Sequence, residues 1–173
     1  MADQTEVRRP EQRSEIEVSR NNGGEMVIVN AAECIAGRMC SKVSKLLLQG
    51  TRVTIVNAEK AVLSGHRHML IEAYKKKLEI SSATNPIHGP FHPRRPDTIL
   101  TRLVRGMLPK RKSSGLEAFR RLRVYVGVPE KLGTSKLLSF DDSKITKPAS
   151  YYITIGEVAR EIGWKSGGIA QSG

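Results

Sequence analysis

The apolar positions after residue 25 alternate between short continuous runs and longer stretches with helical spacing. Two similar segments, IVNAAECIAGR at 28–38 and IVNAEKAVLSGHR at 55–67, each begin with an apolar run typical of a strand buried on both faces. Between them lies a helical pattern that Gly50 ends, with one apolar face made of Ala36, Met39, Val43, Leu46 and Leu47. The order strand, helix, strand predicts a right-handed βαβ unit in a parallel sheet.

The second half of the chain shows a similar mixture of elements. The stretch 69–80 predicts a helix with Leu70, Ala73, Tyr74 and Leu78 facing inward. Four prolines and one glycine within 81–98 predict an irregular loop, and long loops in compact domains are commonly functional. The other predicted elements are helices at 98–107 and 115–122, strands at 123–127 and 151–155, a polar connection at 131–150, and a short helix carrying Val158, Ala159 and Ile162.

Both ends of the chain are poor in large apolar residues. Residues 1–25 are polar and charged, so burial cannot offset the entropy of ordering them, and we expect a disordered, flexible N-terminal tail. Gly and Ser dominate residues 166–173, which we expect to fray at the C-terminus. The prediction is a single α/β domain at 26–165, which suits a chain of 173 residues.

Positive charge is concentrated in one part of the chain. Lys and Arg number 29 against 17 acidic residues, a net charge of +12. Residues 60–123 hold 15 basic and 4 acidic residues, whereas residues 1–25 hold 4 basic and 6 acidic ones. Such a distribution indicates a surface for an anionic partner, a nucleic acid or an anionic membrane. No apolar run is long enough to span a membrane and no signal core is present, so we expect a cytoplasmic protein without a membrane partner.

Two basic loops carry the strongest binding signal. Pro109 precedes Lys110, Arg111 and Lys112, and the pair Arg94-Arg95 stands between two prolines. Proline stiffens these segments, so their charges lose less entropy on binding a phosphate. For the run 75–77 on the predicted helix, a solvated face is as good an interpretation as a phosphate contact.

The few aromatic residues shape the expected mode of binding. They make up 5% of the chain and do not form the aromatic strand motif of a base-stacking sheet. We therefore expect contacts mainly to backbone phosphates and RNA shape, with an affinity that falls steeply with salt.

No pattern in the sequence indicates a cofactor or a catalytic centre. The glycine-rich motifs GxGxxG and GxxxxGK[ST] are missing, and no serine stands in a nucleophile elbow. Glu33 and Glu59, each just after a strand, are either acid–base carboxylates or, as we favour, residues that stabilise the first turn of the following helix. Cys34 and Cys40 lie outside any CxxC motif, which favours free buried thiols.

Two histidine pairs, His66 with His68 and His88 with His92, raise the question of a metal site. Zinc sites need three or four ligands, and no cysteine or carboxylate accompanies either pair at ligand spacing. Both pairs lie beside arginines, where imidazoles can contact RNA. We therefore expect RNA contact and neither a metal nor a cofactor.

Three motifs in order match one known family. VNAAECIAGRMCSKVSKLLLQG, TIVNAEKAVLSG and RLVRGMLPKRKSSGLEAFRRLRVYVGVP closely resemble the ribosomal protein L13 family of the large subunit, over about residues 26–130. The loop HGPFHPRRPDTILTRLVRGML resembles the archaeal and eukaryotic branch, and the closing YITIGEVAREIGW resembles archaeal members. The chain departs from the family in its 1–25 tail and in Ser113 and Ser114, where relatives often have basic or aromatic residues.

The resemblance implies a fold and a role. The fold is a three-layer α/β/α arrangement with a mostly parallel four-stranded sheet, to which the sequence adds basic loop extensions and the tail. The role is structural and not enzymatic: binding large-subunit ribosomal RNA beside neighbouring ribosomal proteins, and supporting subunit assembly and translation. We expect the chain in the large ribosomal subunit of the cytoplasm and not as a homo-oligomer.

The resemblance also suggests roles for particular residues. Residues 106–109 would shape a turn, residues 110–112 would meet phosphates, and residues 65–67 would form a second RNA-facing edge. The full set of candidate RNA-binding residues is Arg38, Lys60, Gly65, His66, Arg67, Lys75, Lys76, Lys77, His88, His92, Arg94, Arg95, Arg102, Arg105, Lys110, Arg111, Lys112, Arg120 and Arg121.

Two alternatives remain open at this point. One is an RNA-processing or nucleotide-binding enzyme on a Rossmann-like sheet, which should show a glycine-rich phosphate loop or convergent carboxylates. The other is a translational regulator that binds messenger RNA outside the ribosome, and the sequence does not discriminate against it as an additional role.

Overall fold

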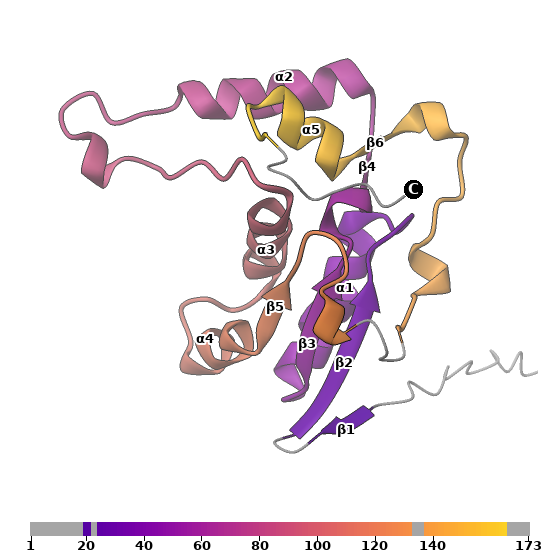
Figure 1. Cartoon of the computed structure of the whole chain (residues 1–173). Helices are drawn as coiled ribbons and strands as arrows, with labels where there is room; N and C mark the ends of the chain where they lie inside the picture. Colours follow the sequence, from indigo (N-terminus) through magenta and orange to yellow (C-terminus); the bar gives the residue numbers. More distant parts are fainter. Residues whose placement is uncertain (1–18, 22–23, 133–136, 166–173) are drawn as a thin grey trace, which may run out of the picture.

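The apolar runs of the sequence form the centre of a four-stranded sheet with strand order β1-β2-β3-β5 (Figure 1). This computed structural model describes residues 19–21, 24–132 and 137–165. β2 (Gly24–Asn30), β3 (Arg52–Val56) and β5 (Leu122–Val124) run parallel, and β1 (Ser19–Asn21) pairs antiparallel with β2. The predicted α/β class and the mostly parallel four-stranded sheet are confirmed.

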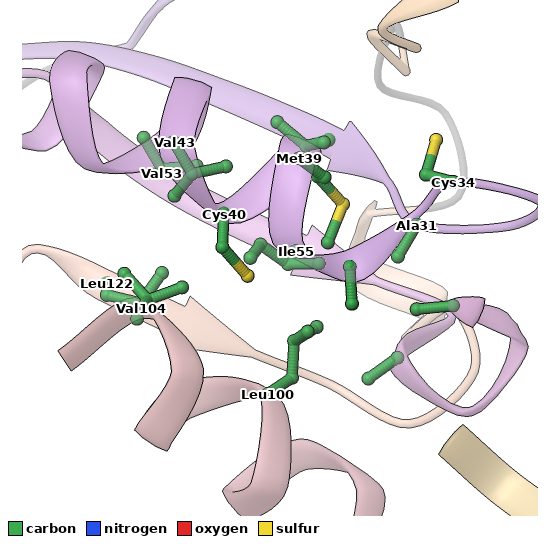
Figure 2. Packing of buried hydrophobic residues seen from close by; sticks show 14 of the residues in the cluster. Ala31, Cys34, Met39, Cys40, Val43, Val53, Ile55, Leu100, Val104 and Leu122 are labelled. Carbon is green, nitrogen blue, oxygen red and sulfur yellow. The ribbon is translucent and has the colours of Figure 1, made fainter. Parts of the chain in front are cut away.

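The main hydrophobic core lies between the sheet and the helices α1 (Ala36–Leu48) and α3 (Pro96–Met107). The two helices pack against each other as well as on the strands. Figure 2 shows the side chains that meet there, and all are fully or almost fully buried: Met39, Cys40 and Val43 from α1, Val53 and Ile55 from β3, Leu100 and Val104 from α3, and Leu122 from β5. The predicted apolar face of α1 is therefore the face that forms the core.

Burial also decides the chemistry of the two cysteines. Both thiols are free, and both side chains are buried. Loss of hydration raises the pKa of the Cys40 thiol to about 12 and also raises the pKa of the Cys34 thiol, because burial disfavours the thiolate. The expectation of free buried thiols is confirmed.

The remaining elements surround this core. α4 (Ser113–Arg120) precedes β5, while α2 (Arg67–Glu79) lies against α5 (Ile155–Glu161). Thr154 caps α5 by accepting a hydrogen bond from the backbone of Glu157 at 3.1 Å. A second, antiparallel sheet pairs β4 (Val62–Ser64) with β6 (Tyr152–Thr154), and the 3₁₀ turns are η1 (Ala58–Lys60), η2 (Pro86–His88), η3 (Glu130–Leu132), η4 (Asp141–Ser143) and η5 (Ala149–Tyr151).

Several predicted boundaries shift by a few residues. The helix expected at 98–107 begins at Pro96, since proline fits the first helical position, where no backbone N–H is needed. The helix expected at 115–122 spans Ser113–Arg120, and the strand expected at 123–127 is Leu122–Val124. At the C-terminal end, α5 begins at Ile155, immediately after β6.

The predicted inward face of α2 is wrong in part. Leu70, Tyr74 and Leu78 are half-buried, but Ala73 is exposed, and no residue of α2 is fully buried. The helix lies on the outside of the domain, where α5 covers part of one side (Figure 1). A helical repeat in the sequence marks the contact face but does not report how much of that face is covered.

The N-terminal boundary also differs from the prediction. Ser19 lies opposite Met26, and Asn21 lies opposite Gly24, so part of the expected 1–25 tail forms a hairpin with the first parallel strand. Residues 1–18 and 166–173 lie outside the described residues, and the tail and frayed end expected there stay predictions. Within the described ranges, none of the helices is long and apolar enough to cross a membrane.

Two methionines provide a matched test of this core. Met39 is fully buried between α1 and the sheet, whereas Met69 on α2 is 66% exposed. We expect Met39→Ala to lower the free energy of unfolding by about 2–5 kcal/mol, because it removes buried contacts and leaves a cavity. Met69→Ala should change it by less than about 0.5 kcal/mol in the same urea titration. Equal losses for the two variants would contradict the core described above.

Candidate nucleic-acid interface

The loop between α3 and α4 presents three consecutive cationic side chains. Lys110, Arg111 and Lys112 are all exposed, and no carboxylate among the described residues lies within ion-pair distance of them. The backbone N–H of Lys112 donates to the carbonyl of Pro109 at 2.9 Å, and that of Lys110 donates to Leu108 at 2.8 Å. Leu108 itself is buried, so the loop begins from a fixed point.

Gly115, in the first turn of α4, lies very close to Pro109 at the start of this loop. A Cβ atom at this position would lie far inside van der Waals contact of the Pro109 carbonyl oxygen, and 3.0 Å from Pro109 Cγ. The first turn of α4 therefore packs directly on the start of the loop, as only glycine allows. This contact holds the backbone of the three cationic residues at a defined place.

α3 links the two basic loops predicted from sequence. Its first residue follows the α2–α3 loop (residues 80–95) and its last precedes the α3–α4 loop (residues 108–112) (Figure 1). Arg102 and Arg105 are exposed and lie three residues apart, so they are neighbours along one side of this helix. A 12-residue helix is about 18 Å long, and both arginines lie in its C-terminal half, next to the α3–α4 loop.

Three cations of α2 have acidic partners within the protein, whereas Lys77 Nζ lies 4.8 Å from the centroid of the Tyr74 ring. Arg67 contacts Glu157 at 2.6 Å, and Lys75 lies 3.7 Å from Glu161, so both connect α2 to α5. Lys76 bonds to Glu72 at 2.9 Å, which lowers the pKa of that carboxyl and raises the pKa of the lysine. Acidic side chains therefore partly neutralise Arg67, Lys75 and Lys76, whereas the cations of the α3–α4 loop have no described carboxylate partner.

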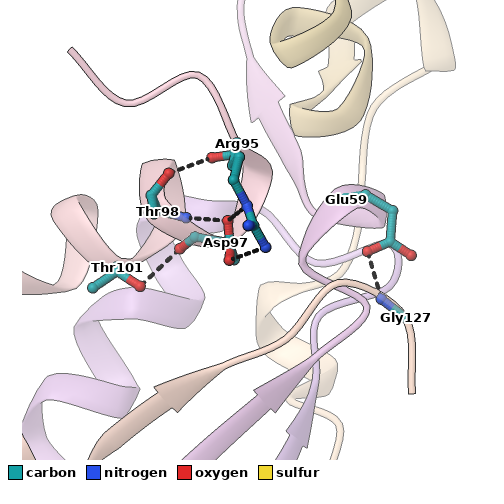
Figure 3. A network of polar contacts seen from close by, with 6 residues as sticks. All are labelled: Glu59, Arg95, Asp97, Thr98, Thr101 and Gly127. Atoms are coloured by element: carbon teal, nitrogen blue, oxygen red, sulfur yellow. Dashed lines mark hydrogen bonds and ion pairs between the residues drawn. The ribbon is translucent and has the colours of Figure 1, made fainter. Parts of the chain in front are cut away.

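In the α2–α3 loop, too, some histidines and arginines contact other groups of the protein, and others are exposed. His88 and Arg94 are exposed, and His92 places Nε2 at 2.7 Å from the carbonyl of Ile80. Arg95 forms two contacts with Asp97, from Nε at 3.2 Å and from Nη2 at 3.0 Å (Figure 3). Arg94 therefore presents a less neutralised charge than Arg95.

The remaining candidates are spread over other elements. Arg121 is half-buried and donates to the carbonyl of Leu47 at 3.3 Å, so it stabilises the C-terminal end of α1. Arg38 and Lys60 are exposed, as is Arg120 at the end of α4. The predicted edge formed by Gly65, His66 and Arg67 lies at the start of α2, beside β4 (Figure 1).

The two carboxylates considered for catalysis have no shared site. Glu59 accepts a hydrogen bond from the backbone of Gly127 at 3.0 Å and so joins η1 to the segment after β5 (Figure 3). Glu33 is exposed, with a left-handed φ of 58°, and α1 has no acidic residue in its first turn. The favoured explanation of Glu33 as a helix-stabilising residue is therefore wrong. Among the described residues, no three His, Cys, Asp or Glu side chains converge on a possible metal position.

Comparison with known proteins decides the family. The family model described as ribosomal protein L13 matches residues 24–131. The chain belongs to this family. It is 45% identical to the large ribosomal subunit protein uL13 of Aeropyrum pernix, over 84% of this chain and 96% of that protein. The corresponding proteins of Archaeoglobus fulgidus and Saccharolobus solfataricus are each 41% identical, over 86% and 81% of this chain and 94% of their own lengths.

Membership of this family confirms several of the predictions made from the sequence. The resemblance to archaeal L13 proteins is confirmed, and so is the assignment to the large ribosomal subunit. These relatives are named as ribosomal proteins and not as enzymes, in agreement with the expectation of a non-catalytic role.

One prominent side chain, Phe91, is absent from the candidates predicted from the sequence. Phe91 is 75% exposed in the α2–α3 loop, and the guanidinium carbon of Arg102 lies 5.6 Å from its ring centroid. The sequence contained a signal, because a phenylalanine between two prolines in a basic loop has few core positions to fill. A low aromatic content over the whole chain obscured this local feature.

Two glycines test the closure of the α3–α4 loop. We expect Gly115→Ala to lower the free energy of unfolding by about 1–3 kcal/mol, because its methyl group overlaps the Pro109 carbonyl. A methyl group added at Gly106 on α3 would point into open space, so Gly106→Ala should be neutral or stabilising by up to about 1 kcal/mol. Chemical denaturation of both variants checks this, and a harmless Gly115→Ala would contradict the packing.

Proposed function

We propose that this chain binds large-subunit ribosomal RNA through its basic loops, and that it supports subunit assembly and translation in this way. The observation that carries the proposal is the α3–α4 loop, where three adjacent cations are exposed on a backbone held by Pro109 and Gly115. Fixed cations of this kind suit phosphates that are themselves fixed in a folded RNA.

The difference between cations with and without an acidic partner supports an interface in which some cations contribute more to RNA binding than others. The α3–α4 loop, Arg102 and Arg105 have no described carboxylate partner, whereas Arg67, Lys75 and Lys76 do. We infer that the side of α3 and its two flanking loops make the principal phosphate contacts. The α2 cations and the 65–67 edge contribute less, and Arg121 acts chiefly within the fold.

The physical role follows from charge neutralisation. RNA helices repel one another, and a protein that places cations between their backbones lowers the free energy of a packed arrangement. A folded α/β body holds these cations with little further loss of entropy on binding. The remaining surface is available for neighbouring ribosomal proteins, and we propose that the chain acts as a single copy and not as a homo-oligomer.

The enzyme alternative loses support on two grounds. Glu59 is committed to a backbone contact with Gly127, and Glu33 lies on an exposed turn, in no group of three described His, Cys, Asp or Glu side chains that could hold a metal. The relatives carry the name of a large-subunit protein.

A triple substitution tests the principal contact. Replacing Lys110, Arg111 and Lys112 by Ala should weaken binding to large-subunit ribosomal RNA in filter-binding assays. The slope of log affinity against log salt should become shallower by about 0.7–0.9 for each lost phosphate contact. An unchanged slope would contradict phosphate contact by this loop.

The control removes the same amount of charge elsewhere. Lys42, Lys144 and Lys147 already contact Asp142, Asp141 and the Tyr151 ring, respectively. Replacing these three by Ala leaves the same net charge as the loop variant. We expect the control to retain most of the binding and of the salt slope, which separates a local contact from a general effect of charge.

A cellular measurement tests the assembly role. In cells that carry a tagged copy, the wild-type chain should remain with large subunits after a high-salt wash in sucrose gradients. The loop variant should be depleted from these fractions and should raise the proportion of incomplete large subunits. Loss of the wild-type chain from large subunits in the wash would contradict a structural role.

A further inference from the structure

Two adjoining hollows flank residues 90–93 in the α2–α3 loop. One has a volume of about 300 Å³ and the other of about 500 Å³, and Phe91 lines both. The floor of the smaller hollow is apolar, with Tyr74 and Leu78 from α2 and Ile99 and Leu103 from α3. A volume of about 300 Å³ lies at the lower end of the range for small-molecule sites.

The segment between the hollows is held in place. His92 Nε2 lies 2.7 Å from the carbonyl oxygen of Ile80, and a carbonyl oxygen can only accept, so Nε2 carries the hydrogen. Pro90 and Pro93 restrict the backbone on either side of Phe91. The exposed ring is therefore presented on a segment with little conformational freedom to lose.

The charges around the hollows are all of one sign. Lys77 and Arg102 line the smaller hollow, and Arg94 and Arg95 line the larger one. No carboxylate belongs to either lining, and Asp97 offsets Arg95 from outside. Arg102 lies over one face of the Phe91 ring, and a residue that is 75% exposed keeps its other face accessible.

These features select one chemical class of ligand. An apolar slot beside an exposed aromatic ring suits a flat unsaturated group, and cations on both sides suit flanking anions. We propose that this site captures a single unstacked nucleobase of an RNA, which stacks on Phe91 while Arg102 and Arg94 hold the adjoining phosphates. This inference rests on the proposed RNA-binding function and adds a base contact to it.

An apolar segment of a protein partner fits these observations less well. The apolar floor is small, and cations flank it on both sides, so an extended peptide would place most of its side chains on charged surface. Stacking on an aromatic ring tolerates every base, because each base has a π-face. The site therefore provides affinity and a fixed position rather than sequence selectivity.

The probe for this site is an octameric oligouridylate RNA with one central 2-aminopurine. Uridines stack weakly, so the 2-aminopurine is fluorescent in the free RNA and its fluorescence falls when it stacks on the protein. The full-length wild-type chain should quench the fluorescence on binding. Phe91→Leu keeps an apolar side chain but lacks a π-face, so it should abolish the quenching and weaken affinity by about 5-fold to about 100-fold. Phe91→Tyr keeps the ring and should restore both.

Ile87 provides the matched control, because it is 89% exposed in the same loop and lines neither hollow. Ile87→Ala should quench and bind like the wild type. The thermal unfolding midpoint of each variant confirms folding, and both substituted side chains are exposed. Phe91→Leu should also leave the salt slope unchanged, since it removes no charge.

The outcomes separate this inference from the proposed function. If the wild type binds ribosomal RNA with a steep salt slope but Phe91→Leu quenches and binds equally well, the base site is refuted and RNA binding stands. Retention of full RNA affinity and quenching by Phe91→Leu, together with loss of a ribosomal protein neighbour, would assign the site to a protein instead. If the wild type does not bind RNA at all, the proposed function itself fails.

Discussion

The packing of α1 and α3 onto one face of the parallel strands is the interaction on which the rest of this structure depends. Met39, Cys40 and Val43 from α1 meet Leu100 and Val104 from α3, and none of these side chains retains measurable exposure. Interiors packed this closely do not let a helix rotate or slide without loss of contacts. The orientation of α3 is therefore determined by its buried side, and so are the positions of the loops at both its ends.

The position of the exposed side of α3 follows from this constraint. Arg102 and Arg105 point away from the core because Leu100 and Val104 occupy it, and the loops at the two helix ends carry further cations. Ion pairs on α2 reduce the charge available there, although an exposed pair contributes little to stability. The cations that we propose as the principal RNA contacts are those that the fold leaves without a described acidic neighbour.

Much of the fold was predictable because its signals are local. The βαβ unit follows from two apolar runs and the spacing of Met39, Val43 and Leu47, and the core uses those residues as predicted. The α2 prediction fails at Ala73 because coverage of a helix depends on distant segments, here α5. The β1 hairpin was missed because polar residues can pair through their backbones without any apolar signal.

The sequence by itself determined the fold class, the family, the concentration of positive charge and the stiff basic loop at 109–112. These features depend on composition, on short-range periodicity or on motifs in order, all of which are properties of the linear chain. Only the tertiary structure decided which cations have an acidic partner, such as Arg67, which pairs with Glu157. It also decided that Arg121 binds the carbonyl of Leu47 at the C-terminal end of α1. It also placed Phe91 beside Arg102 over an apolar hollow. The physical reason is the same in each case: pairing and exposure depend on which elements meet in space, and residues far apart in sequence share no local signal of that meeting.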